Sequence, residues 1–223
     1  MNPDSDQELI DPQIALSVYD KVFSVRSGDE IVFTPQIPKV GILAAVYLTL
    51  KDEYVNAFIA AVKKVGENSF YLSLTERIAS HYVPRKGYEN EFREAIHARQ
   101  QGSEYPFAEK VTPIINDWFF PLEAASSLTL HGSQDKPYQN IDNAIYSVNG
   151  NWGLWFSNDG FAIIGGSEEF VTTFYGVINK TIEEMAVRFI KAIQNKQTAF
   201  QYLRSLFGVD EAERYIKIFH ESI

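Results

Sequence analysis

Glu94 and His97 place a carboxylate and an imidazole three residues apart in a segment whose spacing predicts a charged helix over 89–101. Residues at i and i+3 share one helical face, and Glu-x-x-His pairs supply ligands in di-iron carboxylate bundles. Such a site takes a second Glu-x-x-His pair, yet none of the other three histidines has an acid three residues before it. We therefore interpret the pair as a solvated helix pair and predict no catalytic residue.

A second group of candidate ligands surrounds the polar segment 132–140. His131, Asp135 and Asp142 carry nitrogen and oxygen atoms of the kind that bind zinc and hard cations. Their spacing matches no metal-binding loop pattern, so we predict no metal site.

The glycines of Gly165-Gly166-Ser167 precede a predicted helix, where unpaired backbone amides favour a bound anion. Glu168 and Glu169 already bring negative charge to that position. The chain also lacks the GxxxxGK[ST], GxGxxG and GxSxG patterns. We predict no cofactor, and the motifs favour a non-catalytic protein, although an enzyme with an unfamiliar site stays open.

Aromatic residues and acids gather in one part of the chain. Residues 111–180 hold seven acids and two bases. Neighbouring strand residues point to opposite faces of a sheet, so two adjacent aromatics cannot share one core. If a helix covers the face to which the second aromatic points, that residue belongs to the core. If the face is uncovered, the aromatic is an anchor for a basic partner. The residues expected to bind a partner are Trp152, Trp155, Asp159, Asp142 and Tyr146.

Three strands that run from Ala144 to Gly166 must position these residues. Asn149-Gly150 predicts the first turn, with positive φ at both central residues, and the four residues 157–160 predict the second. Asp210 with Glu213 predicts a capping box for the last helix.

Periodicity and turn residues predict the remaining elements. Helices are expected over 12–23, 52–65 and 89–101, from 168 onward with a break near 176 and a restart at 181–184, and over 198–207 and 210–221; strands are expected over 31–33, 70–74 and 128–130. Segment 42–50 fits a strand or a buried helix, and Thr112-Pro113 favours a helix start before the apolar residues 118–120.

These elements predict an α+β fold, with an antiparallel meander-based sheet covered by helices and a helical C-terminal third. We expect one domain over 1–223, with 132–140 as the candidate place for a subdivision.

Composition excludes several classes of protein. The chain is 45% hydrophobic, has no cysteine and carries a net charge of −9. A packed core is therefore expected, disulfides and thiolate chemistry are excluded, and the acid excess argues against nucleic acid as a partner. The first ten residues are polar, and the longest apolar run, 40–50, is shorter than the roughly 20 residues that span a bilayer. We expect a cytoplasmic protein with no membrane partner.

The segment Asn151 to Phe174 resembles a strand-turn-strand-helix block of uncharacterised bacterial proteins, including immunity-protein families of toxin systems. The resemblance rests on Asn151-Trp152-Gly153-Leu154 to Ser157, on Ala162 to Gly166 and on Phe170. It implies an immunity-like interaction protein and assigns no functional residue.

Three functions follow as hypotheses. The first is an immunity-like protein that binds a basic protein partner through an acidic aromatic surface. The alternative is a small-molecule-binding domain or enzyme with a pocket between sheet and helices. The third is a homodimer formed through the apolar residues of the C-terminal helices, which are Phe200, Leu203, Leu206, Phe207, Tyr215, Ile218 and Phe219.

Overall fold

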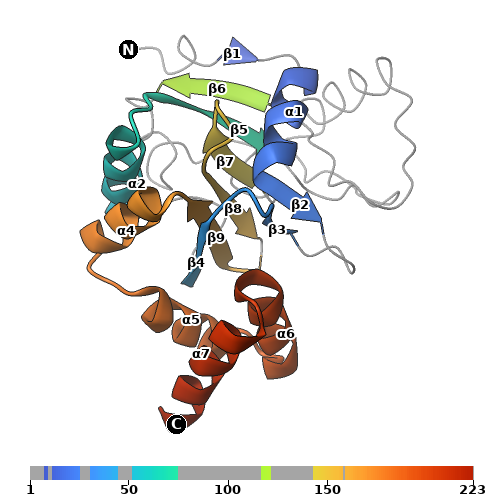
Figure 1. Ribbon diagram of the computed structural model, residues 1–223, viewed down its shortest axis with the longest axis vertical. Coiled ribbons are helices and arrows are strands. Elements are labelled where there is room, and N and C mark those ends of the chain that lie inside the picture. Colours follow the sequence, from blue (N-terminus) through green and yellow to red (C-terminus); the bar gives the residue numbers. More distant parts are fainter. Residues whose placement is uncertain are drawn as a thin grey trace, which may run out of the picture.

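A seven-stranded antiparallel sheet, in the order β1-β6-β5-β7-β8-β9-β4, is the centre of the molecule (Figure 1). The computed structural model describes residues 8–9, 12–25, 31–44, 52–74, 117–121, 143–157 and 159–222. The strands of this sheet are β1 (Glu8–Leu9), β4 (Lys39–Ala44), β5 (Ser69–Leu74), β6 (Asp117–Pro121), β7 (Asn143–Ser147), β8 (Gly153–Ser157) and β9 (Phe161–Gly166). A separate hairpin pairs β2 (Phe23–Val25) with β3 (Ile31–Phe33).

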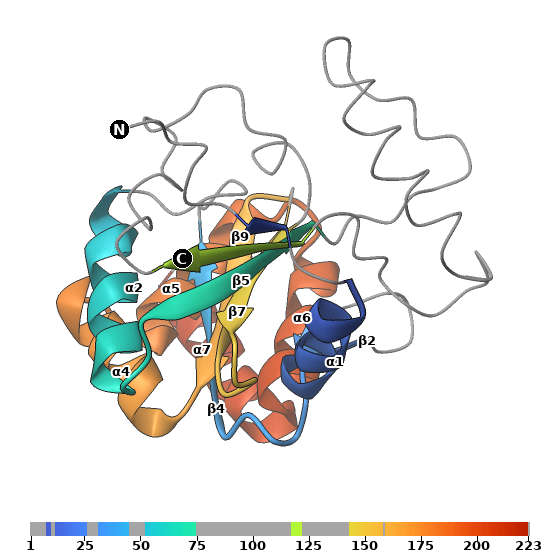
Figure 2. The same cartoon turned by 90° about the horizontal axis from the view of Figure 1, so that it is seen from above.

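Six described helices surround the sheet. They are α1 (Pro12–Val22), α2 (Asp52–Lys64), α4 (Glu168–Val177), α5 (Ile182–Ala192), α6 (Lys196–Phe207) and α7 (Val209–Glu221). Helices α2 and α4 lie together on one side of the sheet, and α1 and α6 lie on the other side (Figure 2).

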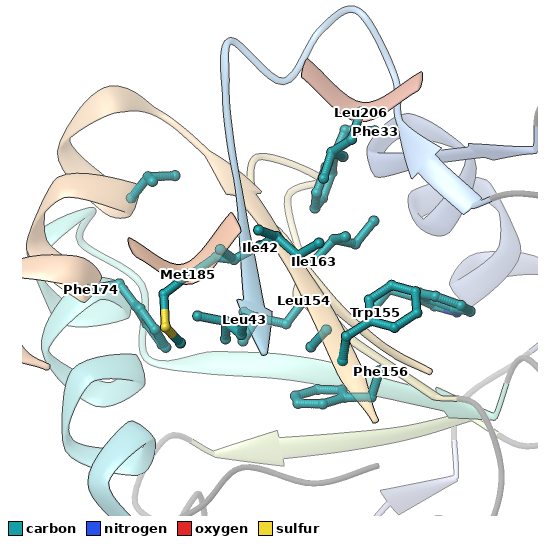
Figure 3. Close-up of a cluster of buried hydrophobic side chains, with 14 of the residues drawn as sticks. Phe33, Ile42, Leu43, Leu154, Trp155, Phe156, Ile163, Phe174, Met185 and Leu206 are labelled. Atoms are coloured by element: carbon teal, nitrogen blue, oxygen red, sulfur yellow. The ribbon is translucent and has the colours of Figure 1, made fainter. Parts of the chain in front are cut away.

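Both faces of the central strands are buried, as the burial of every residue in β8 and β9 shows. Trp155 pairs with Ile163 and Ala144, whereas its neighbour Phe156 pairs with Ala162 and therefore points to the opposite face (Figure 3). A layer covers each face, so both aromatics belong to the core. The continuous apolar sequence of these strands is typical of a sheet that is covered on both sides.

The face beneath α2 and α4 is filled with aromatic rings. Trp152 stacks on Phe170 of α4, with ring centroids 5.1 Å apart, and meets Phe58 of α2 edge-on at 5.5 Å. Phe58 also meets Phe70 of β5 at 5.3 Å. These contacts join α2 and α4 to β5 and to Trp152, the residue that precedes β8, through one cluster.

The opposite face is covered by α1, the β2–β3 hairpin and α6. Tyr146 of β7 meets Tyr19 of α1 and Phe23 of β2 at 5.7 and 6.2 Å. Further along the same face, Phe161 of β9 meets Tyr202 of α6 at 5.1 Å. The sheet therefore separates two distinct core layers.

Helix α5 packs along β4, the last strand of the sheet. Its first turn is fixed by a capping box, in which Thr181 and Glu184 exchange hydrogen bonds of 2.9 and 3.0 Å. Its last turn is closed by the ammonium of Lys196, which donates to three backbone carbonyls. An edge strand covered in this way is protected from pairing with another chain.

The predicted fold class is confirmed: the protein is α+β, its sheet is antiparallel and contains the β7–β8–β9 meander, and its C-terminal part is helical. Segment 39–44 is a strand, which settles part of the ambiguity over 42–50. The expected elements at 89–101 and 128–130 lie outside the described residues.

Three local predictions are wrong. Asp117–Pro121 forms strand β6 rather than continuing a helix from Thr112-Pro113, because it pairs with both β1 and β5. Helix α7 begins at Val209 behind Gly208, with no side-chain cap, so Asp210 and Glu213 form no capping box. At the first meander turn Gly150 has positive φ, but Asn149 does not.

Candidate partner-binding surface

The two turns of the meander have the same pattern of hydrogen bonds. In each, a serine carbonyl accepts the amide of the glycine three residues later, at 3.2 Å, and the serine hydroxyl accepts the amide two residues later. Gly150 and Gly160 close the turns with φ of +77° and +84°, which glycine adopts without steric cost. Ser147 and Ser157, which begin the turns, are the buried polar residues of the described core.

The first tip, residues 147–150, is anchored to the segment between α2 and β5. The hydroxyl of Ser147 lies 2.8 Å from both carboxylate oxygens of Glu67, just beyond the C-terminus of that helix. The same hydroxyl accepts the Asn149 amide at 2.9 Å. The hydroxyl therefore joins the turn to the segment that connects α2 and β5.

The second tip, residues 157–160, presents Asp159 to solvent. The amide of Asp159 is bonded to Ser157 at 3.1 Å, while its carboxylate takes part in no ion pair with any described residue. The backbone beneath this charge is thus held in place, but no described residue neutralises the charge. Of the five residues predicted to bind a partner, Asp159 is the one that the structure shows exposed.

The three aromatic residues of the predicted surface are buried, so they do not form it in this structure. Tyr146, Trp152 and Trp155 have exposed fractions of 0, 1 and 7%. Trp152 packs beneath α2 and α4, whereas Tyr146 and Trp155 lie on the other face of the sheet. The prediction failed because helices cover both faces. Asp142, the remaining member, lies outside the described residues.

The indole N–H of Trp152 is a buried donor that has no hydrogen-bond acceptor among the residues that the structure describes. It lies in the layer between the meander and α2 and α4, where a small-molecule pocket was the alternative expectation. An unmet donor of this kind costs about 1–3 kcal/mol. The rings of Phe58 and Phe170 contact the same indole.

The acids at the N-terminus of α4 have partners within the chain. Glu168 pairs with Lys39 of β4 at 3.5 Å, and Glu169 pairs with Lys64 of α2 at 3.1 Å. Ser167 accepts the Phe170 amide and caps the helix. Gly166 leaves room for the Phe170 ring, since a Cβ there would lie 2.8 Å from it. These glycines and acids therefore serve the local structure.

The apolar residues of the C-terminal helices pack mainly within the chain. Leu203, Leu206, Tyr215 and Phe219 are buried, and Phe200, Phe207 and Ile218 are half-buried. The large apolar side chains that are exposed in the described part are Val177 at 49% and Val209 at 62%. Single exposed valines are ordinary on protein surfaces, and the homodimer stays a prediction.

The hydroxyls of three tyrosines have structural partners. Tyr175 and Tyr202 donate to the carbonyls of Ile42 and Ile31 at 2.7 and 3.0 Å. Burial raises the pKa of Tyr175 well above its usual range. Burial also raises the pKa of Tyr215, whose hydroxyl bonds Glu211. Neither phenol is prepared for proton transfer near neutral pH.

The other candidates for chemistry add no site. Glu94, His97, His131 and Asp135 lie outside the described residues. Within the residues that the structure places, no group of three or more His, Asp or Glu side chains is arranged to hold a metal ion. No helix of this described part is long and apolar enough to cross a membrane.

Sequence reasoning missed Ser147, Ser157 and Glu67. A signal was present, because the pattern Ser-x-Asn/Asp-Gly occurs at 147–150 and again at 157–160. It predicts two turns of equal design in which the serine hydroxyl binds the backbone. The contribution of Glu67 needed the three-dimensional structure, since 80 residues separate it from Ser147.

Comparison of the chain with protein-family models, with curated proteins and with solved structures finds no match in any of the three.

Proposed function

We propose that the chain is a non-catalytic bacterial interaction protein, immunity-like in its role, that binds a basic protein partner in the cytoplasm. The observation that carries this proposal is the second tip of the meander. Asp159 stands exposed there on a turn whose backbone is held by two hydrogen bonds to Ser157. A backbone that is already held in place loses little freedom on binding.

The charge of the molecule favours a basic partner. The chain carries a net charge of −9, and Glu168 and Glu169, which follow the far end of β9, are already paired with lysines. Asp159 has no such pair among the described residues, so its charge is available to a lysine or arginine of a partner. Complementary charge of this kind speeds association and excludes acidic partners.

A charge-matched pair of variants tests the proposal. D159N and N149K each change the charge by one unit, at the same position of two turns of the same design. The tagged protein is first used to capture partners from its native lysate at low and moderate salt, with identification by mass spectrometry. We expect a basic protein that is lost as salt rises.

The affinity of that purified protein for each variant is then measured. D159N should weaken binding about two- to fivefold, in line with about 0.5–1 kcal/mol for an exposed charge pair, and N149K should bind like the parent. Equal binding by D159N and the parent would rule out this tip as the contact. Retention of acidic proteins alone, or of no protein, would overturn the proposed function.

A small-molecule-binding domain or enzyme is the second candidate, and the buried donor of Trp152 favours it. A ligand that supplies an acceptor to this indole would have to displace Phe58 or Phe170 from it. Thermal-shift screening tests this candidate, since a ligand raises the melting temperature of the native protein that it binds. A ligand whose effect is equal in W152F would not use the indole N–H.

A further inference from the structure

Asn149 combines the features of a site of chemical self-modification. It is exposed, and its side chain makes no hydrogen bond with any described residue. The residue that follows, Gly150, has no side chain to hinder attack by its backbone nitrogen. Asn149-Gly150 is also the one Asn-Gly pair in the sequence. Asparagines in such surroundings are among the chemically labile positions of proteins.

We propose that Asn149 deamidates through a cyclic imide, and that the Ser147 hydroxyl sets the rate by holding the turn closed. The deprotonated amide nitrogen of Gly150 attacks Cγ of Asn149, a nitrogen–carbon bond forms and ammonia leaves. One water then opens the ring at either carbonyl and gives aspartate or isoaspartate. The sequence of steps needs only water and no oxidant or reductant.

Hydrogen bonds in the first tip oppose this attack. The Gly150 amide is bonded to the Ser147 carbonyl at 3.2 Å, and the Asn149 amide is bonded to the Ser147 hydroxyl at 2.9 Å. Glu67 holds that hydroxyl from the other side at 2.8 Å. The amide of Gly150 becomes available when the turn opens locally. Weakening the hydrogen bonds of the Ser147 hydroxyl, which we call the clamp, should therefore speed deamidation.

The product changes the charge of the tip. Aspartate at 149 would place a carboxylate at the position that Asp159 occupies in the second tip. Isoaspartate would add a backbone carbon within a turn that is closed by the 3.2 Å bond from Gly150 to Ser147 and flanked by a 3.0 Å bond from Ser147 to Trp152. Both products make the chain more acidic, and the inference does not depend on the proposed function.

Other asparagines serve as internal references. Asn179 is exposed but is followed by a lysine, and Asn195 uses its side-chain oxygen to cap α6 by accepting from Gln197 and Thr198. Asn179 thus lacks the following glycine, and Asn195, which precedes Lys196, lacks both the glycine and the unbonded side chain. Asn149 should therefore convert before either reference.

The test incubates the intact protein at mildly alkaline pH and follows each asparagine by peptide mapping with mass spectrometry. We expect conversion at Asn149 to exceed that at Asn179 and Asn195, to rise with pH, and to vanish from this position in N149Q. The S147A variant should convert about fivefold faster, the effect of losing a hydrogen bond worth about 1 kcal/mol on local opening.

The variant S157A removes the matching hydroxyl from the second tip and so controls for general destabilisation. It should leave the rate at Asn149 unchanged. Conversion at Asn149 no faster than at the reference asparagines would overturn the proposal. Equal acceleration by S147A and S157A, or none by S147A, would overturn the role of the clamp.

Discussion

At the scale of single residues, the buried hydroxyl of Tyr175 connects helix α4 to strand β4. It donates to the Ile42 carbonyl at 2.7 Å, and its ring fills the space that Gly41 leaves open. Both contacts hold the helix against the edge of the sheet. Such a buried hydrogen bond contributes about 1 kcal/mol to stability, and more is lost if the carbonyl is left without a donor.

The raised pKa of Tyr175 predicts a loss of stability in alkali. An unfolded tyrosine ionises near pH 10, whereas burial raises the pKa in the folded protein. The unfolded state therefore loses its proton first, so the stabilisation is complete below about pH 10 and is lost as pH rises through the folded pKa. Urea unfolding at pH 8 and above about pH 10 should show this fall.

The variant Y175F should be less stable than the parent at pH 8, by about 1–2 kcal/mol, and should lose less stability in alkali. Tyr215, whose pKa is also raised, accounts for part of the fall that remains. An unchanged alkaline slope in Y175F would contradict the assignment to Tyr175.

The residue scale is also where sequence reasoning about the site failed. Trp152 and Trp155 are three positions apart and therefore point to opposite faces of one sheet, which the spacing alone could indicate. That both faces are covered could not be predicted, because helices α2 and α6 arrive from distant parts of the chain. Exposure of an aromatic depends on that covering layer.

At the scale of elements, two glycines in or against α4 should respond in opposite ways to alanine. Gly176 lies in the last turn of α4, and a Cβ there would meet no atom within 4 Å. G176A should stabilise the protein by about 0.5–1 kcal/mol, because alanine loses less backbone entropy than glycine in a helix. Chemical denaturation provides the measurement.

The matched variant G41A should destabilise instead. A Cβ at 41 would lie 2.5 Å from the Tyr175 hydroxyl oxygen, so the ring would have to leave its hydrogen bond. Overpacking of this kind costs about 1–3 kcal/mol. Alanine effects of equal sign at the two positions would show that the packing of α4 against β4 is not as described.

Elements with strong local signals could be predicted from the sequence. The periodic apolar residues of α2 and the capping box of α5 each appear where the pattern placed them. Strand β6 could not be predicted, because its neighbours β1 and β5 lie far from it in the sequence. The start of α7 was misplaced because Gly208, rather than Asp210, precedes its first turn.

At the scale of the whole molecule, Trp152 and Trp155 report on the two core layers separately, because they lie on opposite faces of the sheet. The chain has a third tryptophan, Trp118 in β6, so it is replaced in both variants. Variants that then retain only Trp152 or only Trp155 should unfold in urea with the same fluorescence midpoint, since one sheet serves both layers. Midpoints that differ beyond the effect of the substitutions would mean that the layers unfold independently. Circular dichroism of each variant supplies the control.

The glycines beneath the aromatic rings have a consequence for how the strands find their alignment. In a sheet with one solvent-exposed face, a shift of the strand register by one residue exposes apolar side chains to water and is therefore unfavourable. Here both faces of β8 and β9 are buried, so a slip would exchange one apolar residue for another. A Cβ at Gly153 would lie 2.5 Å from the Phe23 ring, and one at Gly165 would lie 2.7 Å from Phe33. A shifted strand would bring a side chain into the space above these glycines, where the rings already lie. The correct register is therefore specified by the glycines, which have no side chain.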